Sequence, residues 1–155
     1  MLAMGTQAIF TFNILATKTI KIKWPKSQIH KNPKKVVVAN RTLSKAAGLV
    51  DIFSAFGSIE AREFYRADEE VFDVIINGTS TSLSGDLPPL NPACIAAHTC
   101  VYDMVYSSAD TSFMRWAKAC GAQQVADGKG MLVGQAAESF RLWRGVKPAV
   151  APVLE

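Results

Sequence analysis

Beyond residue 35, short apolar runs alternate with stretches in which apolar residues recur every three or four positions. The runs are typical of strands buried on both faces of a parallel sheet, and the second spacing is typical of helices. We expect strands at Val36–Ala39, Ile59–Ala61, Phe72–Asn77, Thr99–Val105 and Gln124–Ala126. We expect helices from Thr42 or Ser44 to Gly57, from Ser112 to Cys120 and from Met131 to Trp143.

These elements follow one another without a turn that would join neighbouring strands into a hairpin. Alternation of this kind predicts an α/β fold, a Rossmann-like doubly wound parallel sheet. The stretch from Gly78 to Pro92 is rich in Ser, Thr, Gly and Pro and is typical of a loop. Gly145 would end the last helix.

Residues 1–35 do not follow this pattern. Residues 19–24 alternate like a strand, but Pro25 and Pro33 interrupt any regular element. The first 50 residues carry nine Lys or Arg and no acid, although the whole chain has a net charge of only +4. Such a stretch can attract nucleic acid or an anionic membrane, but few aromatic residues accompany it for base stacking. We therefore expect a solvated, lysine-rich leader over residues 1–35 and one α/β domain over residues 36–155.

The overall composition, with 49% hydrophobic and 19% charged residues, is that of a globular protein. No apolar run is long enough to span a bilayer, and the apolar start lacks the basic residues that open a signal peptide. The three cysteines have no CxxC spacing and the two histidines lie far apart, so we expect no metal site. Unpaired thiols suit a reducing compartment such as the cytoplasm.

Asn40, Arg41 and Thr42 follow the first predicted strand, and Lys45 comes one turn later. Ligands bind at the carboxyl ends of the strands in such sheets, and NAD-binding folds place Asp or Glu here to bind the ribose hydroxyls. In this chain Arg41 takes that place. A guanidinium can pair with a 2′-phosphate through two hydrogen bonds, so these residues favour NADP over NAD. A solvated loop arginine would explain Arg41 alone.

Two further polar groups follow predicted strands. Asn77 and Thr79 belong to a small turn that would let a dinucleotide approach the backbone, although a plain turn explains them equally well. Alternation sends Tyr102, Met104 and Tyr106 to one side of their strand. Met104 would suit a nicotinamide ring and Tyr106 a hydroxy acid, whereas a core stripe is the simpler interpretation.

The last group stands at the start of the last predicted helix. Gly128 and Gly130 free the backbone there to approach a ligand. Gln135 lies one turn after Met131 and shares its side of the helix. Taken alone, Gln135 would be an exposed surface amide.

Five segments occur in a fixed order: Asn-Arg-Thr at 40–42, Phe-Asp-Val-Ile-Ile-Asn-Gly-Thr-Ser at 72–80, Ser-Gly-Asp-Leu-Pro-Pro-Leu at 84–90, Tyr-Asp-Met-Val-Tyr at 102–106 and Asp-Gly-Lys-Gly-Met-Leu-Val-Gly-Gln at 127–135. This series resembles the carboxyl-terminal lobe of the shikimate dehydrogenase family. The resemblance extends from about Val36 to the end of the chain. Gly78 replaces a usual Ala of the family, and Ser112 replaces a usual Pro.

The resemblance implies an oxidoreductase that interconverts shikimate and 3-dehydroshikimate with NADP in aromatic amino-acid biosynthesis. It implies cofactor binding by Asn40, Arg41, Thr42, Lys45, Asn77, Thr79, Met104 and Gly128. It also implies that Tyr106 and Gln135 reach the substrate. A quinate-preferring relative of the same family remains an alternative.

Two features of the family have no counterpart in the sequence. A glycine-rich loop should cradle the pyrophosphate shortly before Val36, but Gly5 is the only glycine ahead of Asn40. Thr6–Phe10 would then be the remains of the helix after that loop, and the first central strand would be missing. The Lys–Asp pair that transfers the proton belongs to the family's amino-terminal lobe, so the catalytic residues stay unassigned. We therefore expect weak NADP binding and little turnover from this chain alone.

Other interpretations remain open. The chain could be a non-catalytic remnant that serves as an interaction module, or a nucleic-acid binder that acts through residues 1–35. The chain could also form a homodimer, or a complementing chain could supply the missing lobe. The expected partners are otherwise small molecules, NADP and shikimate or 3-dehydroshikimate, with no membrane partner.

Overall fold

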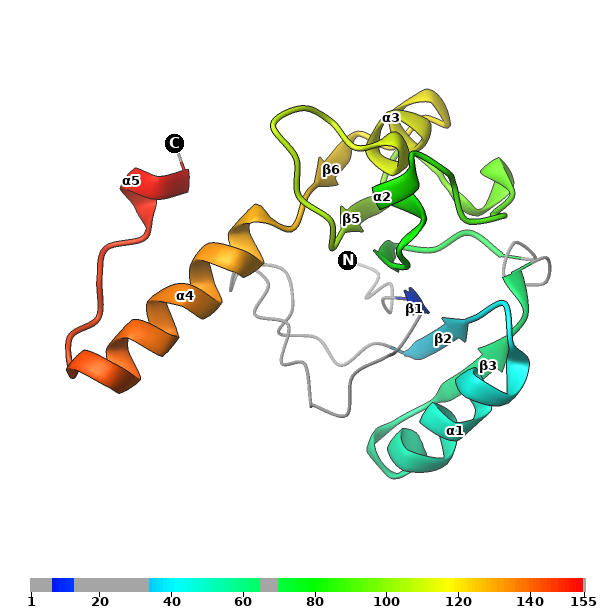
Figure 1. The fold of residues 1–155 in the computed structure, drawn as a ribbon. Coiled ribbons are helices and arrows are strands. Elements are labelled where there is room, and N and C mark those ends of the chain that lie inside the picture. The colour runs from blue at the N-terminus through cyan, green and yellow to red at the C-terminus, as the bar shows by residue number, and fades with distance from the viewer. Residues whose placement is uncertain (1–6, 13–33, 65–69, 155) are drawn as a thin grey trace, which may run out of the picture.

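The computed structural model describes residues 7–12, 34–64 and 70–154, and its centre is a six-stranded parallel sheet (Figure 1). The strand order is β3-β2-β1-β4-β5-β6, which is that of a doubly wound dinucleotide-binding sheet. The strands are β1 (Gln7–Phe12), β2 (Lys35–Ala39), β3 (Ile59–Arg62), β4 (Val74–Gly78), β5 (Cys100–Asp103) and β6 (Gln124–Ala126). The α/β fold class expected from the sequence is confirmed.

The central strand β1 corrects one expectation. We expected Thr6–Phe10 to be the remains of a helix and the first central strand to be missing, but Gln7–Phe12 form that strand. In the parallel register Phe10 lies opposite Val38 of β2 and Ile76 of β4. A short apolar run suits a buried strand and a buried helix equally well, so periodicity alone does not separate the two. Residues 19–24, which alternate like a strand, lie outside the described residues.

Helices lie on both sides of this sheet. In Figure 1, α1 (Leu43–Phe53) lies beside β2 and β3, and α3 (Ser112–Ala119) lies beside β5 and β6, toward the other end of the strand order. The remaining elements are the 3-10 turns Ser54–Phe56 and Pro92–Cys94 and the helices α2 (Thr81–Ser84), α4 (Lys129–Arg144) and α5 (Ala151–Leu154). Within the described ranges, no helix has the length and apolar character needed to cross a membrane.

Most predicted boundaries agree with the structure to within two residues, and the end of β5 shows the cause of one such difference. We expected this strand to run to Val105, but it ends at Asp103. The backbone N–H of Val105 donates to the Asp103 side chain at 3.2 Å instead of continuing the sheet. This side-chain bond turns the chain at the edge where ligands bind.

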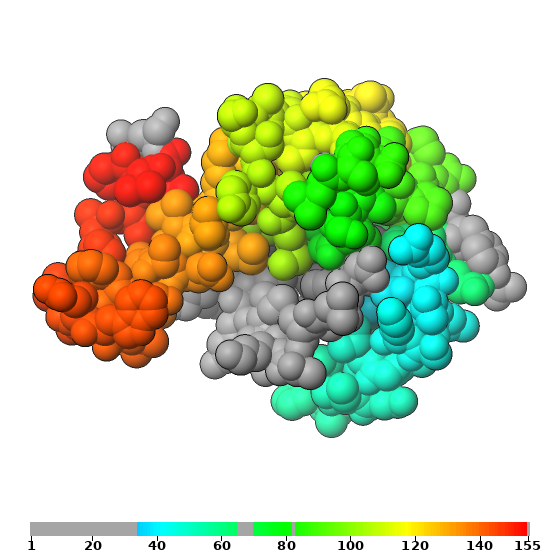
Figure 2. Space-filling view, viewed as in Figure 1, coloured from blue at the N-terminus to red at the C-terminus, as the bar shows by residue number. Residues whose placement is uncertain are grey.

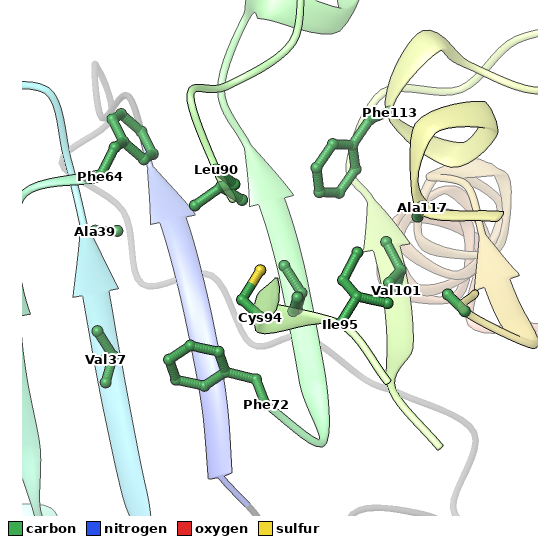
Figure 3. Close-up of a cluster of buried hydrophobic side chains, with 12 residues drawn as sticks. Val37, Ala39, Phe64, Phe72, Leu90, Cys94, Ile95, Val101, Phe113 and Ala117 are labelled. Carbon is green, nitrogen blue, oxygen red and sulfur yellow. The ribbon is translucent and has the colours of Figure 1, made fainter. Parts of the chain in front are cut away.

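A cluster of buried apolar side chains fills the space between the sheet and α3 (Figure 3). Val37, Ile75 and Val101 contribute from three strands, and Phe113 contributes from α3. Phe72 enters the cluster from the segment just before β4 and is completely buried. This cluster holds the strand ends, and therefore the loops that follow them, in fixed positions.

The long helix α4 contrasts with this core because it has few partners among the described residues. Figure 2 shows α4, in orange, extending to one side of the molecule. Ala137 is its only buried residue, whereas Leu142 and Trp143 are 68% and 80% exposed. A helix of this length is marginal in water unless its apolar side packs against something, so α4 presents an apolar surface suited to a partner.

Four charged side chains form a network at the β2–β3 side of the sheet. Lys35 Nζ lies 3.1 Å from a carboxylate oxygen of Glu60 and 2.7 Å from one of Glu70. Arg62 lies 2.7 Å from Glu60 and 2.9 Å from Glu70. The hydrogen bond from Arg62, assisted by the one from Lys35, lowers the pKa of Glu60 to about 2.

Acidification should therefore destabilise the chain partly through Glu60. Its folded-state pKa lies below the ordinary value of 4.5, so its contribution to stability is complete above that value and is lost as the pH falls toward 2. Urea unfolding measured between about pH 6 and about pH 3 should show a smaller loss of stability for Glu60→Gln than for the unaltered chain. Equal losses in the two proteins would show that Glu60 contributes nothing to the acid response.

Candidate nucleotide-binding site

An open groove runs along the carboxyl edge of the sheet, with a volume of about 430 Å³. It is lined by Lys45, Gly78, Thr79, Ser80, Leu83, Met104 and Val105. These residues follow β2, β4 and β5, and β1 lies between β2 and β4. The groove therefore lies at the point where the strand order reverses, which is where doubly wound sheets bind nucleotides. Its volume is in the range of small-molecule sites.

Of the two cations expected from the sequence, Lys45 lines the β2 side of the groove and Arg41 lies in the turn beside it. The buried side chain of Asn40 accepts a hydrogen bond from the backbone N–H of Thr42 at 2.8 Å and so forms the turn that leads into α1. Thr42 is the N-cap residue of α1, but its side chain makes no capping hydrogen bond. Arg41 lies within this turn, Lys45 follows it in the first turn of α1, and both side chains are exposed. The turn thus presents two cations at the carboxyl end of β2.

The β4 side of the groove rests on a buried polar side chain. Asn77 is completely buried, and its Oδ1 accepts from the backbone N–H and the hydroxyl of Thr79, at 3.1 and 2.7 Å. The backbone carbonyl of Asn77 accepts from the N–H of Met104 at 2.9 Å. Asn77 therefore shapes the floor of the groove, and Thr79 and Met104 line it.

Sequence reasoning missed two polar residues beneath this floor. Asp103 is completely buried and Thr111, the cap of α3, is 5% exposed. The Thr111 hydroxyl donates to the Asp103 carboxylate at 2.7 Å. Asp103 was visible in the sequence as an acid inside an apolar run, and a buried acid requires hydrogen-bond donors. The sequence did not show which donors these would be.

Gly128 brings the start of α4 against the end of β5. Its N–H donates to the carbonyl of Val105 at 3.1 Å. A Cβ at this position would lie 2.1 Å from the carbonyl oxygen of Met104, closer than any real contact. Only glycine therefore allows the two backbones to approach so closely.

The two residues expected to reach a substrate lie outside the groove. Tyr106 is 55% exposed in the loop after β5, and Gln135 is exposed on α4. Tyr102 is buried, and this burial raises the pKa of its phenol. Because β5 ends at Asp103, the strand alternation that grouped Tyr102 with Tyr106 does not continue as far as Tyr106.

A second hollow, of about 460 Å³, lies beside α3 at the start of β5 and β6. It is lined by Cys100, Val101, Lys118, Gln123, Gln124, Val125 and Ala126. Although it is slightly larger, Cys100 and Gln124 begin their strands, away from the carboxyl edge. The described residues also contain no cluster of three or more groups suited to a metal ion. The carboxyl-edge groove is the better ligand site because it combines a cation, small residues and close backbone approach.

A six-stranded parallel sheet in this order, with such a groove at its reversal point, defines a dinucleotide-binding domain of the Rossmann type. Comparison with known proteins identifies its relatives. The Shikimate 5′-dehydrogenase C-terminal domain matches residues 128–155. The NADP(+) shikimate dehydrogenase of Hahella chejuensis is 59% identical over 127 residues, which cover 81% of this chain and 46% of that protein. The corresponding enzyme of Saccharophagus degradans is 52% identical over 132 residues, covering 81% and 48%.

Solved structures of two proteins also superpose on this chain. An Ael1 enzyme from Pseudomonas putida superposes with a TM-score of 0.72 at 36% identity, over 79% of this chain and 45% of that one. Shikimate dehydrogenase from Thermus thermophilus, solved with NADP(H) and shikimate, superposes with a TM-score of 0.61 at 32% identity, over 76% and 42%. The chain belongs to the shikimate dehydrogenase family and spans about half the length of the relatives it matches.

Proposed function

We propose that this chain forms the NADP-binding half of a shikimate dehydrogenase, an oxidoreductase that interconverts shikimate and 3-dehydroshikimate. The observation that carries the proposal is the pair of exposed cations, Arg41 and Lys45, where a carboxylate would mark an NAD site. The relatives from Hahella chejuensis and Saccharophagus degradans, both named as NADP(+) enzymes, support this cofactor. In this proposal residues 36–155 form the domain, and β1 adds its central strand.

The described residues fit the adenosine end of NADP. Asn40 fixes the turn between β2 and α1, so that Arg41 is available to pair with the 2′-phosphate through two hydrogen bonds. Lys45 lines the same groove and adds a second positive charge. The first turn of α1 contains no acidic residue that would repel a phosphate.

The residues also fit the nicotinamide end, although the pyrophosphate lacks a glycine-rich cradle. Gly128 and Met104 bring two backbones together beside the groove, where bound NADP would supply the hydride acceptor. Residues 13–34, between β1 and β2, contain no glycine. A loop that approaches a pyrophosphate closely normally requires glycine, so we expect weaker binding than in a complete site.

For the substrate, we propose that Tyr106 and Gln135 contact shikimate or 3-dehydroshikimate. Hydride leaves the alcohol carbon only while a base accepts the hydroxyl proton. None of the described residues beside the groove is assigned that role, so we expect little turnover by this chain alone. A quinate-type preference is the alternative within the family, because Tyr106 and Gln135 do not separate the two substrates.

A complementing chain would then supply the remaining half, and a homodimer is the other assembly we propose. The exposed apolar residues of α4, Leu142 and Trp143 above all, support a surface of this kind. The same surface would serve the alternative function, a non-catalytic interaction module. We further propose a cytoplasmic location, which suits the three cysteines because none of them forms a disulfide within the part of the chain that the structure describes.

Exchanging Arg41 for glutamine tests the proposed cofactor. NADPH binding should weaken about tenfold, since a charge-assisted pair with the 2′-phosphate is lost, whereas NADH binding should stay the same. Isothermal titration calorimetry of the full chain measures both affinities. Arg144→Gln, which removes an exposed arginine from the end of α4, is the matched control and should change neither. Equal affinities for NADPH and NADH in the unaltered chain would contradict the NADP assignment.

A further inference from the structure

A completely buried carboxylate, that of Asp103, lies beneath the nicotinamide end of the groove. It accepts hydrogen bonds from three directions: the Thr111 hydroxyl at 2.7 Å, the Val105 backbone N–H at 3.2 Å and the Asn77 side-chain amide at 3.3 Å. These donors belong to the cap of α3, the loop after β5 and the end of β4. One side chain therefore connects three separate segments.

The hydrogen bonds around Asp103 have a single consistent direction. Thr79 donates its only hydroxyl proton to Asn77 Oδ1, so the 2.6 Å bond between Thr79 and Thr81 must be donated by Thr81. Thr111 likewise gives its proton to Asp103, and its oxygen accepts from the N–H of Met114 at 3.2 Å. On both sides of Asp103 each donor points toward the carboxylate. The Asp103 carboxylate is the acceptor in all three of these bonds.

Two of the three segments that Asp103 connects, those after β4 and β5, also form walls of the groove. Thr79 and Val105 line it, and both belong to the hydrogen-bonded set around the carboxylate. The carbonyl of Val105 in turn holds Gly128 at the start of α4. None of these bonds reaches Arg41 or Lys45, because β1 separates β2 from β4.

We propose that Asp103 is a positioning residue for the nicotinamide end of the cofactor. Its carboxylate holds the loops after β4 and β5 in the one arrangement that admits the nicotinamide half of NADP(H), and it does not act on the adenosine half. The inference rests on the proposed function of the groove. It assigns to Asp103 a specific effect on one half of the ligand, which a role in general stability would not produce.

Asp103→Asn separates these roles because it keeps the size of the side chain and converts one acceptor into a donor. The probes are NADPH and adenosine 2′,5′-bisphosphate, which contains only the adenosine half, both titrated calorimetrically into the full chain. We expect the affinity for NADPH to fall about tenfold, since at least one donor loses its acceptor. The affinity for the bisphosphate should change less than about twofold.

Thr99→Val is the matched control. Thr99 is also completely buried and bonds to Phe72 and Ala96, at 2.8 and 2.9 Å, but it lies just before β5, away from the groove. It should lower stability and leave the ratio of the two affinities unchanged. Thr111→Val, which keeps the carboxylate and removes one donor, should reproduce the selective loss in smaller measure if Asp103→Asn does not fold.

The outcomes distinguish this inference from the proposed function. Loss of both affinities to the same degree in Asp103→Asn, or no loss of either, would overturn the positioning role while the unaltered chain still bound both probes. An unaltered chain that bound neither probe would overturn the proposed function and this inference with it. Selective loss of NADPH binding supports both.

Discussion

Replacing Phe72 with alanine should lower the free energy of unfolding by about 3–5 kcal/mol. The ring is completely buried and belongs to the cluster that joins the sheet to α3. Removing it discards the transfer free energy of a large apolar group and leaves a cavity that the surrounding strands cannot fill. A loss of this size is a large part of the stability of an ordinary domain, so the variant should unfold at a much lower urea concentration.

Urea unfolding followed by far-ultraviolet circular dichroism measures this loss. Phe56→Ala is the matched control because it removes the same ring from a position that is 85% exposed, at the end of the turn after α1. It should cost less than about 1 kcal/mol, as exposed substitutions generally do. Similar costs for the two variants would mean that the cluster in Figure 3 does not hold the fold together.

Gly128→Ala should weaken NADPH binding by more than about tenfold and destabilise the chain by roughly 1–3 kcal/mol. The backbone of Gly128 has an ordinary helical conformation, with φ of −73°, so alanine introduces no backbone strain. Its methyl group would lie 2.1 Å from the carbonyl oxygen of Met104 and must push α4 and β5 apart. That movement would break the 3.1 Å bond to Val105 and displace one wall of the groove.

The control for this variant lies two residues further along the chain. A Cβ on Gly130 would meet nothing within 4 Å, and Gly130 lies inside α4. Gly130→Ala should therefore leave NADPH binding unchanged and stabilise the helix by about 0.5–1 kcal/mol. Calorimetric titration and urea unfolding of both variants provide the comparison. Unchanged affinity in Gly128→Ala would show that the contact with Met104 does not shape the site.

The predictable part of the fold is the part determined by local periodicity. The strand Gln124–Ala126 agrees residue for residue with the structure, and α3 starts at Ser112 as expected. In both cases the pattern and the flanking glycine lie within a few residues of each other. The exposed positions of Arg41 and Lys45 after β2 were also predictable, because both residues closely follow the end of a β-branched run.

The rest depends on contacts between distant parts of the chain. Asn77 lies opposite Asp103 only because of the register between β4 and β5, and no local pattern specifies that register. The donors to Asp103 were therefore invisible in the sequence, although the acid itself was not. The strand β1 was mistaken for part of a helix for the same reason, since its partners β2 and β4 identify it.

Hydrogen–deuterium exchange of the chain with and without NADPH tests the central claim most directly, because it locates the bound nucleotide on the backbone. The account predicts slower exchange at residues 40–45, 78–80 and 104–105, which form the groove and the turn beside it. Residues 123–126, at the second hollow, should not change. Protection at the second hollow, or no protection at saturating NADPH, would contradict the assignment of the groove as the nucleotide site.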